Sequence, residues 1–146
     1  MGETPLPVLI QFTAKRYFQV AEERLHKAGL AKLHPPEGQI MAILYSRPGM
    51  SATGIQEALR LSKSTVSEAL NHLVSLGLIE YVVNEENRRE KKIVETEKGK
   101  RHQEQAWKVF SELEKEALEG LSEEELKTLR KTLNKMIENM KGGNHG

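Results

Sequence analysis

The sequence contains no cysteine among its 146 residues. A disulfide framework, a thiolate metal site and a cysteine redox switch are therefore all excluded. The chain also lacks an apolar run long enough to span a bilayer. Its first six residues have neither the basic start and apolar core of a signal peptide nor the hydroxyl residue that a myristoylation signal needs at position six. We therefore expect a cytoplasmic protein with no membrane partner.

The chain also has little net charge. Lys and Arg number 22 against 21 Asp and Glu, which gives a formal net charge of +1. A protein that coats nucleic acid through its overall field would be far more basic. Any binding of nucleic acid must therefore come from a local surface.

The apolar residues at both ends of the chain recur at helical spacing. One stripe lies within residues 6–33, and two more lie within residues 96–141, where Ser122 and Glu125 have the spacing of a capping box. The region between them is too small to cover such long stripes. Long helices with one apolar stripe usually bury it against a second copy of themselves, so we expect the ends to form a homodimer.

The middle of the chain combines short helices with a hairpin. Pro35 can open one helix, and Ser51 and Ser62 can each cap another by accepting a hydrogen bond from a free backbone N–H. At residues 78–83 and 93–94, the spacing of apolar residues changes from the helical period to the period of two that is typical of strands. A polar tip lies between these two segments. The predicted fold is mainly α with a small β-hairpin wing.

Two of the short helices meet at a tight connection over residues 59–62, which is typical of a helix-turn-helix. We expect the second helix to bury Val66, Leu70, Leu73 and Val74. Free N–H groups at its N-terminus can meet a phosphate, and its polar side chains can contact phosphates or base edges, although an ordinary solvated face has the same pattern. The predicted DNA contacts on this helix are Ser62, Lys63, Ser64, Thr65, Ser67, Glu68, Asn71 and His72.

The hairpin favours the DNA interpretation because its tip is basic. Arg88 and Arg89 lie at the tip, and Lys91 and Lys92 follow. Arginine at such a tip can enter the minor groove, where the potential is most negative. A helix-turn-helix followed directly by a basic hairpin is much more specific than either part alone. We therefore predict sequence-specific binding to double-stranded DNA, with these four side chains in the interface.

Short motifs in this central region resemble those of the MarR-type winged-helix regulators. The resemblance covers residues 33–99, roughly half of the chain. Its motifs are Leu-Ser-Lys-Ser-Thr-Val-Ser at residues 61–67, Leu-Gly-Leu-Ile-Glu at 76–80, Asn-Arg-Arg at 87–89, Thr-Glu-Lys-Gly at 96–99 and Pro-Gly-Met-Ser at 48–51.

The resemblance implies a homodimer whose two recognition helices enter successive major grooves of a near-palindromic operator. It also implies a repressor that releases DNA when a small, often aromatic, effector binds between the dimer base and the winged-helix lobe. An aromatic stripe could line that pocket, although plain core packing is its commoner role. The candidate pocket residues are Tyr17, Phe18, Met41, Trp107 and Phe110.

The sequence therefore divides into four segments that form one intertwined domain. Residues 1–33 are expected to form an N-terminal dimerisation helix, and residues 34–95 a winged helix-turn-helix DNA-binding lobe. Residues 96–141 are expected to form C-terminal dimerisation helices, and residues 142–146 a disordered tail.

Two other functions stay open. The near-neutral charge is compatible with a winged-helix module that binds protein instead of DNA. A metal-responsive regulator could use His26, His34 and His102 with Glu22, Glu23 and Glu37, but these residues lack a tight metal spacing, and we predict neither a metal nor a cofactor. The chain has no Gly-rich phosphate loop and no nucleophile elbow, so we predict that it is not an enzyme.

Overall fold

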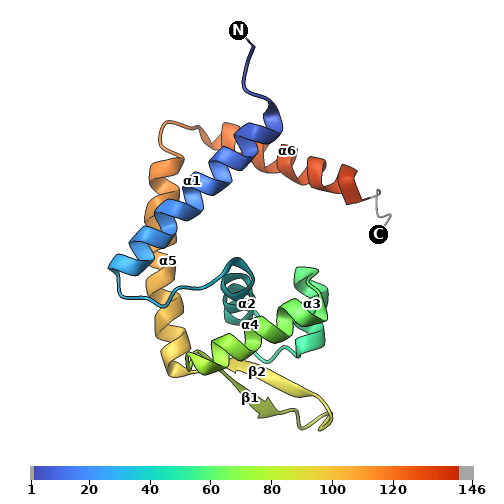
Figure 1. Ribbon diagram of the computed structural model, residues 1–146. Helices are drawn as coiled ribbons and strands as arrows, with labels where there is room; N and C mark the ends of the chain where they lie inside the picture. Colours follow the sequence, from blue (N-terminus) through green and yellow to red (C-terminus); the bar gives the residue numbers. More distant parts are fainter. Residues whose placement is uncertain (1, 142–146) are drawn as a thin grey trace. The chain divides into compact units, whose positions relative to one another are not determined.

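The computed structural model describes residues 2–141, which form helices and one two-stranded antiparallel sheet (Figure 1). The elements are α1 Leu6–Lys27, α2 Pro35–Ser46, α3 Ala52–Leu59, α4 Lys63–Ser75, β1 Ile79–Val83, β2 Lys91–Glu95, α5 Glu97–Ala117 and α6 Glu123–Lys141. The predicted fold class, mainly α with a β-hairpin wing, is confirmed. Among the described residues, none of the helices is long and apolar enough to cross a membrane.

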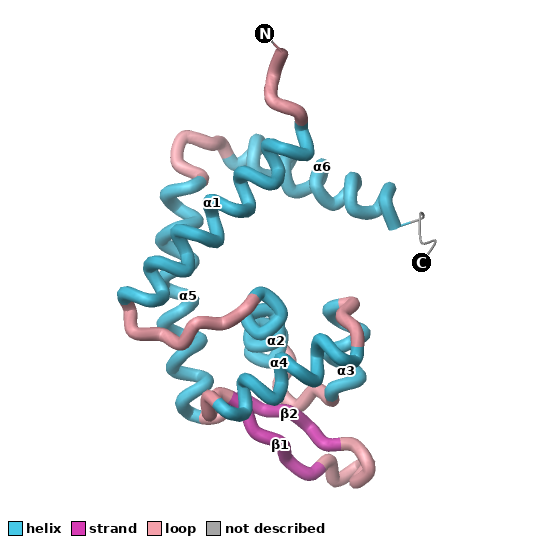
Figure 2. The backbone as a smooth tube through the Cα atoms, viewed as in Figure 1, coloured by secondary structure: helices cyan, strands magenta, loops and turns pink. Residues whose placement is uncertain are grey.

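The chain divides after Leu113 into two units, residues 1–113 and 114–146. The first unit contains a lobe in which α2, α3 and α4 pack beside the hairpin (Figure 2). The predicted segments for dimerisation and DNA binding stay predictions, and the predicted disordered tail, residues 142–146, lies outside the described residues.

The lobe has an apolar core that draws on every one of its elements. Its fully buried side chains are Ile40, Met41, Leu44, Ile55, Val66, Leu70, Leu73, Leu78 and Ile93. The prediction that Val74 belongs to this core is wrong, because 40% of Val74 is exposed. One residue advances about 100° around an α-helix, so Val74, in the last turn of α4, lies about 40° from Leu70 and about 100° from Leu73, at the edge of the buried face.

The helices of the lobe begin where the sequence provides caps. Ser51 Oγ accepts a hydrogen bond from the Gly54 backbone N–H at 3.0 Å, and Ser62 Oγ accepts one from Thr65 at 3.1 Å. Between these two helices, Arg60 has a φ of 56°, in the left-handed region. This single residue ends α3 and lets α4 start after a very short turn, as the helix-turn-helix prediction requires.

The hairpin is attached to the lobe through one short backbone bridge. Ile93 of β2 donates its N–H to Met50 O at 2.8 Å, and Gly49 donates to Ile93 O at 3.2 Å. Ile93 lies opposite Tyr81 in the antiparallel register and is fully buried. The lobe therefore fixes the base of the wing, while the strands extend away from it toward the tip.

The start of α5 is fastened to the end of α4 by a closely packed junction. Thr96 donates its backbone N–H to Leu78 O at 3.0 Å and its hydroxyl to Gly77 O at 2.6 Å, while its Oγ1 accepts from the Gly99 N–H at 3.0 Å. A Cβ on Gly99 would lie only 2.0 Å from Leu78 O. Only glycine at position 99 allows the first turn of α5 to approach this backbone.

The long helices leave much of their apolar surface exposed. α1 buries only Ala21, although its Tyr17 ring stacks on Phe110 of α5 with a centroid distance of 6.4 Å. In the second unit, α6 has no buried residue, and Ser122 and Glu125 form the predicted capping box at 3.0 Å in both directions. The exposed apolar residues of α1 and α6 are Leu6, Leu9, Ile10, Phe12, Phe18, Leu129, Leu133, Ile137 and Met140.

We predict that Gly99→Ala lowers the free energy of unfolding by about 1–3 kcal/mol, the usual cost of forcing extra atoms into a packed site. The measurement is urea unfolding followed by far-UV circular dichroism. Gly38→Ala is the matched control, because Gly38 lies within α2 and an added Cβ would meet no atom within 4 Å. The control should be neutral or stabilising. Equal stability of the two variants would contradict the close approach at Gly99.

Candidate nucleic-acid interface

The N-terminus of α4 carries a small network of hydroxyl groups. Ser62 Oγ donates to Thr65 Oγ1 at 2.8 Å and lies 3.2 Å from Ser64 Oγ. Ser62 and Ser64 are exposed, and Thr65 is half-buried. The partial positive charge of a helix N-terminus favours anions, so these hydroxyls and the free N–H groups are suited to contact a phosphate.

The exposed side of α4 presents short polar side chains in one stripe. Ser64, Ser67, Glu68 and Asn71 are all exposed, and their spacing places them on one face of the helix. Lys63 is exposed beside them. These side chains are short and carry both hydrogen-bond donors and acceptors, so the stripe can contact base edges in a major groove. Of the predicted contacts on α4, these five lie together on the surface of the lobe.

His72 lies differently from the other predicted contacts. Its Nδ1 is hydrogen-bonded to Oε2 of Glu37, a buried residue of α2. The ring of His34 lies nearby, with a centroid distance of 6.4 Å. From the sequence, Glu37 is expected only as a possible metal ligand. Its place in the first turn of α2 signals a cap, but nothing local in the sequence indicates its partner on α4.

Side-chain amides shape the wing tip. Asn84 Oδ1 accepts from the Glu86 N–H at 3.0 Å, and Asn87 Oδ1 accepts from the Arg89 N–H at 3.2 Å. Such bonds to the backbone two residues on are typical of Asx turns. They give the tip a defined turn, so the position of Arg89 is set by the backbone.

The basic side chains of the wing are exposed and mixed with acidic ones. Arg88 forms a loose ion pair with Glu85 at 3.4 Å, and both side chains are more than 70% exposed. Lys91 Nζ lies 5.8 Å from the centre of the Tyr81 ring, and Lys92 is half-buried. An exposed ion pair of this kind contributes little to stability. Arg88 can therefore exchange Glu85 for a phosphate at little cost.

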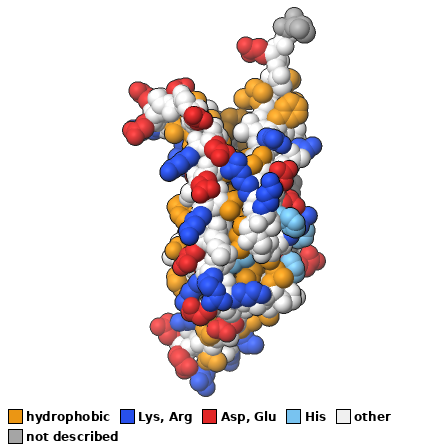
Figure 3. Space-filling view, turned by 90° about the vertical axis from the view of Figure 1, so that its left-hand side faces the viewer, with side chains coloured by type: hydrophobic (Ala, Val, Ile, Leu, Met, Phe, Trp, Pro, Cys, Tyr) orange, Lys and Arg blue, Asp and Glu red, His pale blue; other side chains and the backbone are white. Residues whose placement is uncertain are grey.

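The predicted basic surface is thus local. On the face in Figure 3, acidic and basic side chains alternate along the molecule. This mixture agrees with a net charge of +1. Attraction for DNA would have to come from the few side chains at the tip of the wing and the start of α4.

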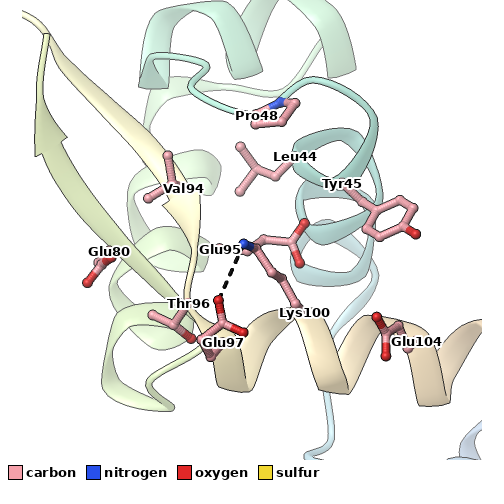
Figure 4. Close-up of a pocket in the computed structure, with 10 residues that line it drawn as sticks. All are labelled: Leu44, Tyr45, Pro48, Glu80, Val94, Glu95, Thr96, Glu97, Lys100 and Glu104. Carbon is pink, nitrogen blue, oxygen red and sulfur yellow. Dashed lines mark hydrogen bonds and ion pairs between the residues drawn. The ribbon is translucent and has the colours of Figure 1, made fainter.

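The five aromatic and apolar residues predicted for an effector pocket do not line the cavity described below. Met41 is fully buried in the lobe, while 59% of Phe18 and 69% of Trp107 are exposed. A cavity of about 630 Å³ lies elsewhere, between α2, β2 and the start of α5 (Figure 4). Its lining residues are Leu44, Tyr45, Pro48, Glu80, Val94, Glu95, Thr96, Glu97, Lys100 and Glu104. None of the five predicted residues is among them.

One carboxylate oxygen in this cavity lacks a partner. Glu95 Oε2 is buried and has no hydrogen bond within the described part of the chain. Burial raises the pKa of Glu95, and the nearby positive charge of Lys100 opposes that shift. Lys100 itself pairs with Glu97 at 3.5 Å (Figure 4). This oxygen is closed off from the cavity, so it becomes an acceptor for a ligand only when the Glu95 side chain turns toward the cavity.

The histidines considered for metal binding do not form a metal centre in the described residues, where no group of three or more suitable ligands lies together. His26 is exposed on α1, and the backbone N–H of His34 donates to Glu37 Oε1 at 2.8 Å. His102 is buried on α5, and neither ring nitrogen has a hydrogen-bond partner of good geometry among residues 2–141. Burial lowers the pKa of His102; the backbone of Ala31 opposes this shift.

Several known proteins are similar to this chain. The HTH-type transcriptional regulator YybA of Bacillus subtilis strain 168 is 29% identical over 104 residues, which cover 66% of this chain and 65% of that protein. A DNA complex of Staphylococcus aureus MepR is 27% identical, with a TM-score of 0.81 over 94% of this chain and 99% of that chain. A MarR-family regulator from Silicibacter pomeroyi is 23% identical and shares the fold, with a TM-score of 0.70 over 92% of this chain and 88% of that chain.

A helix-turn-helix followed by a β-hairpin, with polar side chains on the second helix and arginines at the hairpin tip, defines a winged helix-turn-helix protein. Residues 31–90 match the MarR family. Together with the similarity to YybA and MepR, this match shows that the central part of the chain is similar to the MarR family, as its motifs indicate.

We predict that acid weakens the folded state through His102. Because the folded pKa is lowered, the unfolded chain binds the proton first, so stability falls as pH drops through the unfolded value of about 6.5 and levels off below the folded pKa. His102→Leu should remove this part of the pH dependence, as measured by thermal melts between pH 5 and 8. His26→Gln, at an exposed histidine, is the matched control. The same loss of stability with acid in His102→Leu as in the wild type would contradict the assignment.

Proposed function

We propose that this chain is a sequence-specific transcription regulator of double-stranded DNA, rather than an enzyme, and that it acts in the cytoplasm. The observation that carries the proposal is the pairing, in one lobe, of an exposed polar stripe on α4 with exposed arginines at the wing tip. Similarity to MepR, whose solved structure is a DNA complex, supports the same function. In this interface, α4 lies in a major groove, and Arg88 and Arg89 reach the neighbouring minor groove or its phosphates.

Each predicted contact has a defined role in this proposal. Phosphate contacts position a protein on the duplex, whereas base-edge contacts specify the sequence. Ser64, Thr65 and Ser67 read base edges, and Glu68 could accept from the amino group of a cytosine. Asn71 faces the same groove from the polar stripe. Apart from His72, the remaining contacts hold the DNA backbone, through the cap of α4 and the basic residues of helix and wing.

The proposal includes a homodimer. α1 and α6 each leave several large apolar side chains exposed along their length, and such rows of exposed apolar residues mark interaction surfaces. A second copy of the chain can cover them, because a two-fold interface pairs the same surface of both subunits. A dimer would also present two α4 helices, and these would suit a near-palindromic operator with half-sites about one helical turn apart.

We also propose that the protein is a repressor that a small ligand releases. The cavity between α2, β2 and α5, about 630 Å³, falls in the range of small-molecule sites. It combines an apolar wall at Leu44 and Val94 with the unpaired oxygen of Glu95. A ligand there would contact β2, the strand that leads back from the wing tip. It would therefore be placed to alter the wing, although the aromatic pocket predicted from the sequence stays an alternative site.

The first test is fluorescence anisotropy with a labelled duplex from the region upstream of the gene for this protein, titrated against salt. A regulator should bind tightly at moderate salt, resist competition by mixed DNA, and weaken linearly on a logarithmic salt scale. Absence of binding even at low salt, from a folded protein, would overturn the proposal and favour a module that binds protein.

We predict that Arg88→Ala combined with Arg89→Ala weakens binding to every duplex and reduces the salt slope by about 0.9 for each phosphate that the wing no longer neutralises. The same anisotropy titration measures both effects. Lys15→Ala combined with Lys27→Ala is the matched control, because it removes two exposed charges from α1 and none from the lobe. A slope that stays the same in the wing variant would refute the role of the wing tip.

We predict that Leu133→Glu combined with Ile137→Glu produces a monomer of 16.5 kDa from a wild-type dimer of twice that mass. The reason is that two charges would replace apolar contact surface in the interface. Light scattering after size exclusion gives the mass, and far-UV circular dichroism checks that the helices persist. Lys131→Glu combined with Lys135→Glu changes the opposite face of α6 and should remain dimeric. A wild-type monomer, or a variant that still dimerises, would contradict the interface.

A further inference from the structure

Glu37 is a buried carboxylate with both oxygens bonded. The residue is only 2% exposed, on the helix that also carries the core residues Ile40 and Met41. Its Oε1 accepts from the His34 backbone N–H at 2.8 Å, and its Oε2 is hydrogen-bonded to Nδ1 of His72. A carboxylate in such a place is costly unless it is paired. Both bonds are therefore needed for this side chain to stay inside the lobe.

The two partners of Glu37 belong to different elements. His34 stands at the N-cap of α2, whereas His72 lies 35 residues after Glu37 and belongs to the third turn of α4. One side chain thus fixes both the start of α2 and the side of the helix that is proposed to read DNA. Because an ionised carboxylate can only accept, His72 Nδ1 is the donor in this bond.

His72 lies at the edge of the polar stripe of α4. At about 100° per residue, Ser64, Glu68 and Asn71 point to one side of α4, and His72 lies at the edge of that side next to α2, about 80° from Ser64 and about 40° from Glu68. Its other ring nitrogen, Nε2, makes no hydrogen bond with residues 2–141, and 43% of the side chain is exposed. The structure therefore leaves two roles for the ring, a contact to phosphate through Nε2 or a support for α4 through Nδ1.

We propose that His72 is a positioning residue, which holds α4 against Glu37 at the orientation needed to read bases. The proposal rests on the proposed function of DNA binding and assigns a role in specificity to two residues away from the bases. Base-edge recognition needs placement to within about 0.5 Å, and a directional bond to a buried, doubly held carboxylate supplies that restraint. Contacts to phosphate depend less on the orientation of the helix, so they survive when the bond is removed.

The test measures two duplexes with each variant of the full-length protein. One duplex is an operator recovered by in vitro selection with the wild type, and the other has a scrambled sequence. We expect His72→Leu to weaken operator binding by about 10- to 100-fold, comparable with the loss of one good base contact, and to leave binding to the scrambled duplex and the salt slope unchanged. His72→Asn is the conservative variant, since its amide N–H can occupy the place of Nδ1, and it should restore operator affinity.

A phosphate contact through Nε2 predicts a different pattern. In that case both variants would weaken binding to the two duplexes alike, and the salt slope would fall by about 0.9 for each phosphate released. That result would overturn the proposal. Full operator affinity in a folded His72→Leu protein would overturn it as well.

A second variant separates positioning from stability. His72→Leu leaves a buried oxygen of Glu37 unpaired, which can impair folding. Replacing both partners, Glu37→Leu with His72→Leu, removes the buried unpaired carboxylate. The variant loses the bond to the His34 N–H but should still be more stable than His72→Leu, which thermal melts can check. The folded double variant should still lose discrimination between the two duplexes, because an apolar contact sets no direction; retained discrimination would contradict the proposal. Failure of the wild type to bind any duplex would overturn the DNA-binding function itself, and this inference with it.

Discussion

The backbone carbonyl of Leu78 is the point on which the lobe and α5 depend. It accepts a hydrogen bond from Thr96 at 3.0 Å and lies where a Cβ on Gly99 would come within 2.0 Å. Leu78 itself is buried in the core between α4 and β1. The same short segment therefore ends the recognition helix, starts the wing and receives the first turn of α5. The direction in which α5 leaves the lobe follows from this contact, and so does the cavity that α5 helps to form.

A chain with a net charge of +1 must obtain DNA affinity from a few well-placed groups. The polar stripe of α4 is held by the buried face opposite it. Two asparagine side chains shape the wing tip, and the bridge from Ile93 to Met50 fixes the base of the wing. The fold places these groups accurately, and this placement compensates for the lack of a strong electrostatic field around the protein. A protein built in this way should depend more on the orientation of its helices than a strongly basic one does, because it has little charge to compensate for a poor fit.

Local signals explain what could be predicted from the sequence. Ser51 and Ser62 cap helices, residues 79–83 and 91–95 pair as strands, and Ser122 with Glu125 forms a capping box, because each depends on neighbours only a few residues away. The short motifs also indicated the MarR family. The errors and omissions concern contacts between distant segments. Val74 has a core-type side chain but lies at the edge of the buried face, in the last turn of α4, and the bond between Glu37 and His72 joins positions 35 residues apart.

Two glutamates of the first unit, Glu37 and Glu95, differ in whether their carboxylate oxygens have hydrogen-bond partners. Glu37 has a partner for each oxygen, so its surroundings are complete and its helices are fixed. Glu95 Oε2 has none among the described residues, and burial raises the pKa of that carboxyl group. A buried acceptor without a donor raises the free energy of the folded state, and a ligand would remove that penalty by donating to the oxygen once the Glu95 side chain turns toward the cavity. Glu95 ends β2 beside the start of α5, so a ligand bound there would stabilise one arrangement of wing and helix over others, whereas the contact at Glu37 would keep α4 in place.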